Sequence, residues 1–77
     1  MENVFLISFE ENGNVTYSIN NLLQPMVQYT PQTIFILNGE EVSLDIIMPL
    51  VNGFAIPARI ELERDRLIRL EVTTQKQ

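Results

Sequence analysis

The stretch EVSLDIIMPLVNGFAIPARIELE, residues 41–63, sets an Asn-Gly pair between two long apolar runs. An Asn-Gly pair in such a setting is the strongest short-range signal for a β-hairpin. With a loop over residues 51–53, apolar side chains oppose one another on one face and charged side chains oppose one another on the other. The pattern therefore predicts a long hairpin made of strands 41–50 and 54–63.

In this register residues 48–57 reach past the ends of the neighbouring strands and project as an arm. Pro49 and Pro57 fall where a backbone N–H would point outward, so they discourage strand addition along the arm. The arm either curls back to plug its own barrel or docks on another chain, and exposed apolar patches favour docking. The predicted docking surface comprises Met48, Leu50, Val51, Phe54 and Ile56.

Two further Asn-Gly pairs predict two further hairpins. A three-residue loop ending at Gly13 opposes Phe5 to Ile19 and sorts the first hairpin into an apolar and a polar face. The next hairpin requires an even loop of two or four residues beside Val42, and both lengths stay open. The predicted structural turn residues are Asn12, Gly13, Asn38, Gly39, Asn52 and Gly53.

A fourth turn, which lacks glycine, is centred on Asp65. It opposes Ile60 to Leu70 on the apolar face and Glu61 to Arg69 on the outer face. Opposite charges across antiparallel strands each contribute roughly 0.2 to 1 kcal/mol. The outer face of this hairpin is therefore expected to be solvated.

Six strands follow from these turns, with residues 20–32 as the long connection that is not a hairpin. Pro25 and Pro31 limit this connection to a loop or a short helical turn. We predict an all-β fold, a small antiparallel barrel or two-layer sandwich with mostly hairpin connections, as a single domain with a frayed tail at 74–77. The predicted strands span residues 3–10, 14–20, 33–38, 41–50, 54–63 and 67–73.

Some positions on the nominally polar face of these strands are apolar. Strands that are apolar on both sides are usually central or covered by another element. Either the connection 20–32 or a second subunit is expected to cover them. The positions are Val4, Leu6, Ile34, Ile36 and Ile47.

Chain length and composition separately favour self-association. The chain has 77 residues, no Cys and no His, so it can form no disulfide and is a poor candidate for structural zinc. A domain of this size obtains only about 3 to 5 kcal/mol of net stability from its core. Oligomerisation is the remaining route to greater stability, so we expect a homo-oligomer.

Charge is distributed unevenly along the chain. Residues 1–58 contain acidic residues and neither Lys nor Arg, whereas all the bases lie in residues 59–77. DNA and RNA binding needs a basic surface, so a direct nucleic-acid role is disfavoured and a basic-surfaced protein partner is favoured. Two alternatives stay open: an acidic inhibitor that occupies the nucleic-acid site of another protein, and an OB-like binder acting through Arg59, Arg64, Arg66 and Arg69.

No constellation for catalysis can be assembled from the sequence. Without His or Cys, the serines have no imidazole partner, and Lys76 is the only lysine. Asp45 and Glu61 are the remaining acid–base candidates, but Arg59 and Arg69 face them and favour structural ion pairs. We therefore expect a non-enzymatic interaction or assembly protein with no cofactor and no metal.

The amino terminus lacks the basic segment of a signal peptide, and no apolar run has the roughly 18 residues of a membrane span. We therefore expect a cytoplasmic location and no membrane partner.

Overall fold

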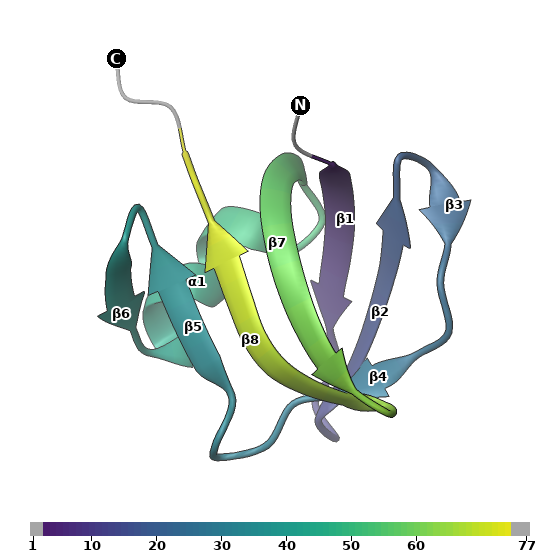
Figure 1. Ribbon diagram of the computed structural model, residues 1–77, viewed down its shortest axis with the longest axis horizontal. Helices are drawn as coiled ribbons and strands as arrows, with labels where there is room; N and C mark the ends of the chain where they lie inside the picture. Colours follow the sequence, from purple (N-terminus) through teal and green to yellow (C-terminus); the bar gives the residue numbers. More distant parts are fainter. Residues whose placement is uncertain (1–2, 75–77) are drawn as a thin grey trace.

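The computed structural model describes residues 3–74 and shows a small β-barrel with one short helix (Figure 1). The predicted all-β class is confirmed. The elements are β1 (Val4–Phe9), β2 (Asn14–Ile19), β3 (Leu22–Leu23), β4 (Val27–Gln28), β5 (Ile34–Leu37), β6 (Glu40–Val42), α1 (Leu44–Val51), β7 (Ala55–Glu63) and β8 (Arg66–Val72).

The first hairpin forms in the predicted register. Phe5 pairs with Ile19 and Phe9 with Val15 across β1 and β2. The turn is made as the sequence indicated, because Gly13 has a φ of 90°, which a residue with a Cβ rarely adopts. Phe5, Ile7, Val15 and Tyr17 of this hairpin are buried, so its apolar face forms one wall of the core.

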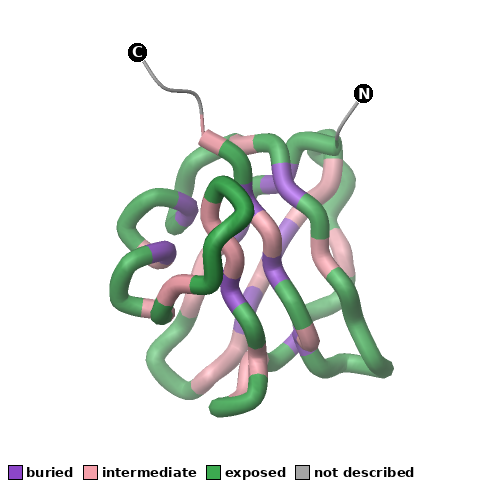
Figure 2. Tube along the Cα trace, turned by 60° about the vertical axis from the view of Figure 1, so that its left-hand side comes forward, coloured by how far each residue is buried: buried purple, intermediate pink, exposed green. Residues whose placement is uncertain are grey.

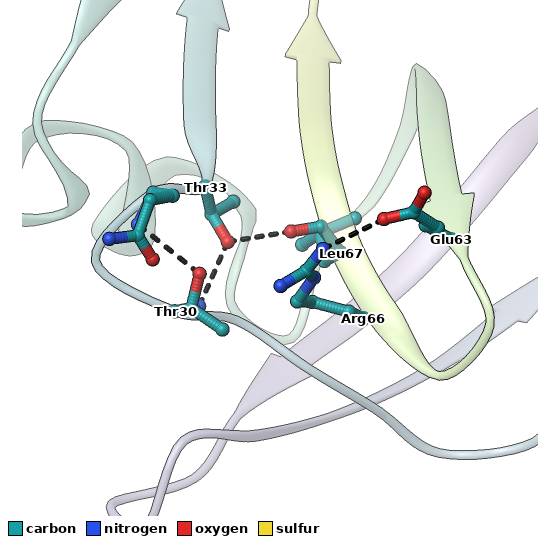
Figure 3. A network of polar contacts seen from close by, with 6 residues as sticks. Thr30, Thr33, Glu63, Arg66 and Leu67 are labelled. Carbon is teal, nitrogen blue, oxygen red and sulfur yellow. Dashed lines mark hydrogen bonds and ion pairs between the residues drawn. The ribbon is translucent and has the colours of Figure 1, made fainter.

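Five strands close into a barrel in the order β1, β2, β4, β8, β7. The short strand β4 completes the ring, because it pairs with β2 on one side and with β8 on the other. At this seam the Gln28 N–H donates to the Asp65 carbonyl at 2.8 Å. Beside it, the Thr33 hydroxyl donates to the Leu67 carbonyl at 2.6 Å and accepts from the Thr30 N–H at 2.9 Å (Figure 3).

The hairpin of β7 and β8 forms around Asp65, with Ile60 opposite Leu70 as predicted. The register shifts between Glu61 and Leu62, so that Leu62 lies opposite Leu67, whereas the register of Ile60–Leu70 and Glu61–Arg69 would continue to Ile68. β7 also bends strongly, as Figure 1 shows: its start, Ala55–Pro57, pairs with β1, and its remainder from Ala58 pairs with β8. This bend lets one strand serve two sides of the barrel.

The predicted hairpin between residues 41–50 and 54–63 is wrong, and with it the projecting arm 48–57. Residues 44–51 form helix α1 instead. Ser43 takes the N-cap position in extended conformation, and the N–H of Asn52 donates to the Met48 carbonyl at 2.8 Å at the other end. Gly53 follows with a φ of 82°, so the third Asn-Gly pair ends a helix and makes no hairpin turn.

The physical reason lies in which residues the helix buries. Ile47 and Val51 are four positions apart, share one helix face and are 0% exposed. The hairpin would have pointed Ile46 to the core and Ile47 outward. Pro49 removes one helical hydrogen bond, but Pro49 and Asp45 are both exposed, so the unpaired Asp45 carbonyl faces water.

Strand β5 pairs in parallel with β8, which the sequence-based meander did not include. Phe35 lies beside Leu70, and on its other edge β5 pairs with β6 across the two-residue turn Asn38-Gly39. This settles the open loop length in favour of two residues. Parallel neighbours need a long crossover, and β6, α1 and β7 together supply it.

The connection 20–32 holds β3 and β4 and no helical turn. Val27 is buried in the core, and the Tyr29 ring packs edge-to-face on Phe9 at 5.7 Å between centroids. Of the expected tail 74–77, Thr74 is held because its N–H donates to Asn38 Oδ1 at 3.0 Å. Residues 75–77 lie outside the described part of the chain.

One apolar cluster fills the barrel and reaches under the helix (Figure 2). None of the buried residues in the described range is charged. The cluster comprises Phe5, Ile7, Val15, Tyr17, Val27, Phe35, Ile47, Val51, Ala58, Leu67, Leu70 and Val72.

Candidate interaction surfaces

Helix α1 is apolar on both of its faces. Seven of its eight residues, LDIIMPLV, are apolar, and Asp45 is the exception. Ile47 and Val51 face the core, whereas Ile46 and Leu50, also four positions apart, remain 53% and 42% exposed on the other side. Figure 2 shows this outer side as an exposed coil with its buried segments turned toward the strands.

The structure separates the residues of the predicted docking surface. Leu50 and Phe54 are exposed, at 42% and 57%, whereas Met48 and Ile56 are half-buried. Val51 is 0% exposed, so it takes no part in any outer surface. Ile56 pairs with Phe5 and belongs to the barrel wall.

Phe54 stays close to the end of the helix, because its N–H donates to the Val51 carbonyl at 3.1 Å. The adjoining residues fix this end of α1 against β1: the Gly53 N–H donates to the Ile7 carbonyl at 2.9 Å, and Asn52 Oδ1 accepts from the Phe9 N–H at 2.7 Å. We call Ile46, Leu50 and Phe54 the helix surface. The end of the helix that carries Leu50 and Phe54 is thus hydrogen-bonded to β1 of the barrel.

The charges near the helix surface are negative. Asp45 lies in the first turn of α1, and its last turn contains no basic residue. Glu40 and Glu41 precede the helix on the edge strand β6 and are exposed. The helix surface is therefore apolar with an acidic margin.

A second apolar area lies on the outside of the barrel. Across four neighbouring strands, Leu23 of β3, Ser18 of β2, Leu6 of β1 and Ala55 of β7 stand side by side. Paired residues in a sheet point to the same side, so these form one row on the outer face.

Next to this row, Val4 pairs with Pro57. Ser8 pairs with Thr16 on the other side of the row. We call this outer face of β3, β2, β1 and the start of β7 the sheet surface. Its apolar members Val4, Leu6 and Leu23 are 42%, 44% and 81% exposed.

The outer face of the remaining strands is charged. There Glu61 pairs with Arg69, whose Nε lies 3.7 Å from Glu61 Oε1, and Arg59 pairs with Glu71. The Glu61–Arg69 pair is one that the sequence predicted, whereas Asp45, which was expected to face Arg59, lies on α1. The basic residues of the OB-like alternative thus stand among carboxylates; at the turn, Arg66 donates to Glu63 at 2.7 Å (Figure 3).

The interior of the barrel is filled by side chains. A gap among Ile7, Val15, Tyr17 and their neighbours measures about 10 Å³, at the limit of what one water molecule needs. Burial raises the pKa of Tyr17 above its ordinary value of 10.0.

A shallow open groove of about 330 Å³ runs from Tyr29 to Leu44, and Glu41 is the only carboxylate among its lining residues.

Within residues 3–74, no three Asp or Glu side chains gather closely enough to bind a metal ion. The single helix of this part of the chain is also too short to cross a membrane.

Comparisons with protein-family models, with curated proteins and with solved structures found no match. The geometry of the chain itself is therefore the basis for its functional interpretation.

Sequence reasoning identified Leu50 and Phe54 but placed them on an arm that does not exist. It missed Ile46, which the hairpin register assigned to the core. The spacing of Ile47 and Val51, the N-cap serine before Asp45 and the glycine after Asn52 are the helix signals that could have found the helix surface.

Proposed function

We propose that this protein is a non-enzymatic interaction protein that docks on a partner protein through the helix surface. The observation that supports this most strongly is the apolar outer face of α1. A helix that is apolar all round is normally buried, yet Ile46 and Leu50 face solvent here. Exposing the apolar helix surface to water is unfavourable in free energy, and contact with a partner would remove it from water.

The partner has an apolar groove with a basic rim. Helix recognition of this kind places residues four positions apart into a groove, and Ile46 and Leu50 have that spacing. Asp45 and the carboxylates of β6 then meet the basic rim. Residues 1–58, which include β6 and α1, contain no Lys or Arg that would repel such a rim.

Affinity capture from extracts of cells that express the protein tests this role. Wild type and Leu62→Asp, a control at an apolar position that is 38% exposed, are expected to retain the same partner. Leu50→Asp and Phe54→Asp are each expected to weaken the affinity for this partner by about 30-fold. This is the effect of losing a central contact of an interface. Recovery should also fall as salt is raised, because the rim contacts are ionic.

The result that contradicts the proposal is equal recovery of every bound protein by wild type, Leu50→Asp and Phe54→Asp. Far-UV circular dichroism must show that all variants are folded. Both substitutions are at exposed positions outside the core cluster, so folding is expected to survive them.

A further inference from the structure

The sheet surface is an open apolar area that no other part of the described chain covers. Segment 20–32 was one expected cover, but β3 extends the sheet beside β2 and does not fold over it. Leu23 and Leu6 stay 81% and 44% exposed. Of the two covers that the sequence pattern suggested, a second subunit is the one that remains.

The sheet surface is also electrically neutral. β1, β2 and β3 contain no Asp, Glu, Lys or Arg, and the hydrophilic members of this face are uncharged: Ser8, Asn14, Thr16 and Ser18. The whole chain carries a net charge of −5, so most ways of bringing two copies together place like charges opposite each other. A neutral face is the place where two copies can meet without this repulsion.

The shape of the sheet surface suits a contact between two copies related by two-fold symmetry. A depression of about 120 Å³ lies over β1 and β2 and is lined by Leu6, Ser8, Thr16, Ser18 and Leu23, among others. Leu23, the most exposed large apolar residue in the described chain, stands at its edge on β3. In a contact with two-fold symmetry, a projecting residue and a depression on one copy meet their counterparts on the other.

We propose that two copies of this chain form a symmetric dimer, sheet surface against sheet surface, with Leu23 of each copy seated in the depression of the other. A dimer of ordinary size buries about 800 Å² on each copy, roughly one seventh of the 5458 Å² of accessible surface. The sheet surface spans four strands, each separated by about 4.8 Å, so the contact covers one side of the barrel.

The dimer does not depend on the helix surface. Leu50 lies on α1, outside the residues that form the sheet surface, so Leu50→Asp should leave the dimer unchanged. Failure of the partner-binding role and failure of the dimer can therefore be told apart. If both hold, the dimer presents two helix surfaces at once.

Sedimentation equilibrium of the full chain tests the dimer over about 1 μM to 1 mM protein, the range in which weak and moderate contacts dissociate. Wild type is expected to reach twice the monomer mass. Leu23→Asp and Leu6→Asp are expected to raise the dissociation constant by about 30-fold or more, because each places two carboxylates in one apolar contact.

Ile34→Asp and Leu62→Asp are the matched controls. Both residues are apolar and about as exposed as Leu6, at 39% and 38%, but they lie on the side of the barrel formed by β5, β8 and β7. Both controls are expected to dimerise like wild type. A wild type that stays monomeric at the highest concentration, or controls that dissociate as readily as Leu23→Asp, would overturn the proposal.

Discussion

Ile46 and Ile47 are neighbours of identical chemistry that the helix sends to opposite environments. Ile47 is 0% exposed beneath α1, and Ile46 is 53% exposed on its outer side. The alternative hairpin exchanges them, with Ile46 in the core and Ile47 outward. Replacing each in turn by valine therefore tests whether residues 44–51 fold as a helix.

The magnitudes follow from burial. Ile→Val removes one methylene, worth about 0.8 kcal/mol of transfer free energy when fully buried, and leaves a small cavity. For Ile47→Val we expect the free energy of unfolding to fall by about 1 kcal/mol. For Ile46→Val the loss should be less than about 0.4 kcal/mol, because half of the side chain already meets water and no cavity forms.

Urea unfolding followed by far-UV circular dichroism measures both values. All samples must have the same protein concentration, because self-association makes apparent stability concentration-dependent. In a domain of this length, 1 kcal/mol also lowers the melting temperature by roughly 4 to 8 °C, which gives a second readout. Equal losses in the two variants, or a larger loss for Ile46→Val, would refute the helix.

Two further predictions concern the barrel. Thr33→Val deletes the hydroxyl that bridges the Thr30 N–H and the Leu67 carbonyl, so the free energy of unfolding should fall by about 1 to 3 kcal/mol. The control Thr73→Val, at an exposed position, should change the free energy of unfolding by less than about 0.5 kcal/mol. Equal effects of the two substitutions would contradict this role for the Thr33 hydroxyl. Because burial raises the pKa of Tyr17, the folded state holds its phenolic proton more tightly than the unfolded state; stability should be full below pH 10.0, the ordinary value, and fall as pH rises through the higher folded pKa. Urea titrations at rising pH should show a smaller alkaline loss in Tyr17→Phe, and an identical loss would contradict the burial argument.

Local sequence patterns made the registers of the β1–β2 and β7–β8 hairpins predictable. Gly13 and the alternation of Phe5, Ile7 and Phe9 specify one register of β1 and β2, because a slip by one residue exposes the apolar face. The charges of β7 and β8 specify the other register in the same way. The bulge at Leu62 left no comparable signal in the sequence.

The helix was missed because two periodicities overlap in one segment. Val42, Leu44 and Ile46 alternate as a strand would, while Ile47 and Val51 repeat as a helix does. Pro49 also favoured a strand over a helix for this segment, since proline is destabilising inside a helix. The parallel pairing of β5 with β8 joins segments more than 30 residues apart, and no local pattern encodes such a pairing.

The candidate surfaces were predictable in part. Leu50 and Phe54 were expected to be exposed and are, although on a helix. The alternation of β1 already indicated that Val4 and Leu6 point away from the core and need a cover. That Leu23 extends the same face was missed, because β3 is only two residues long and Asn20-Asn21 was not interpreted as a turn. Both asparagines have a positive φ, 50° and 70°, and join β2 to β3 as a two-residue hairpin turn.

The self-association of the sheet surface is tested most directly by isotope-filtered nuclear Overhauser spectroscopy on an equal mixture of ¹³C-labelled and unlabelled protein, above the dissociation constant. The sheet-to-sheet dimer predicts contacts between copies from the methyl groups of Leu6 and Leu23. Contacts between copies that arise instead from Ile34 of β5 and Leu62 near the end of β7 would contradict it.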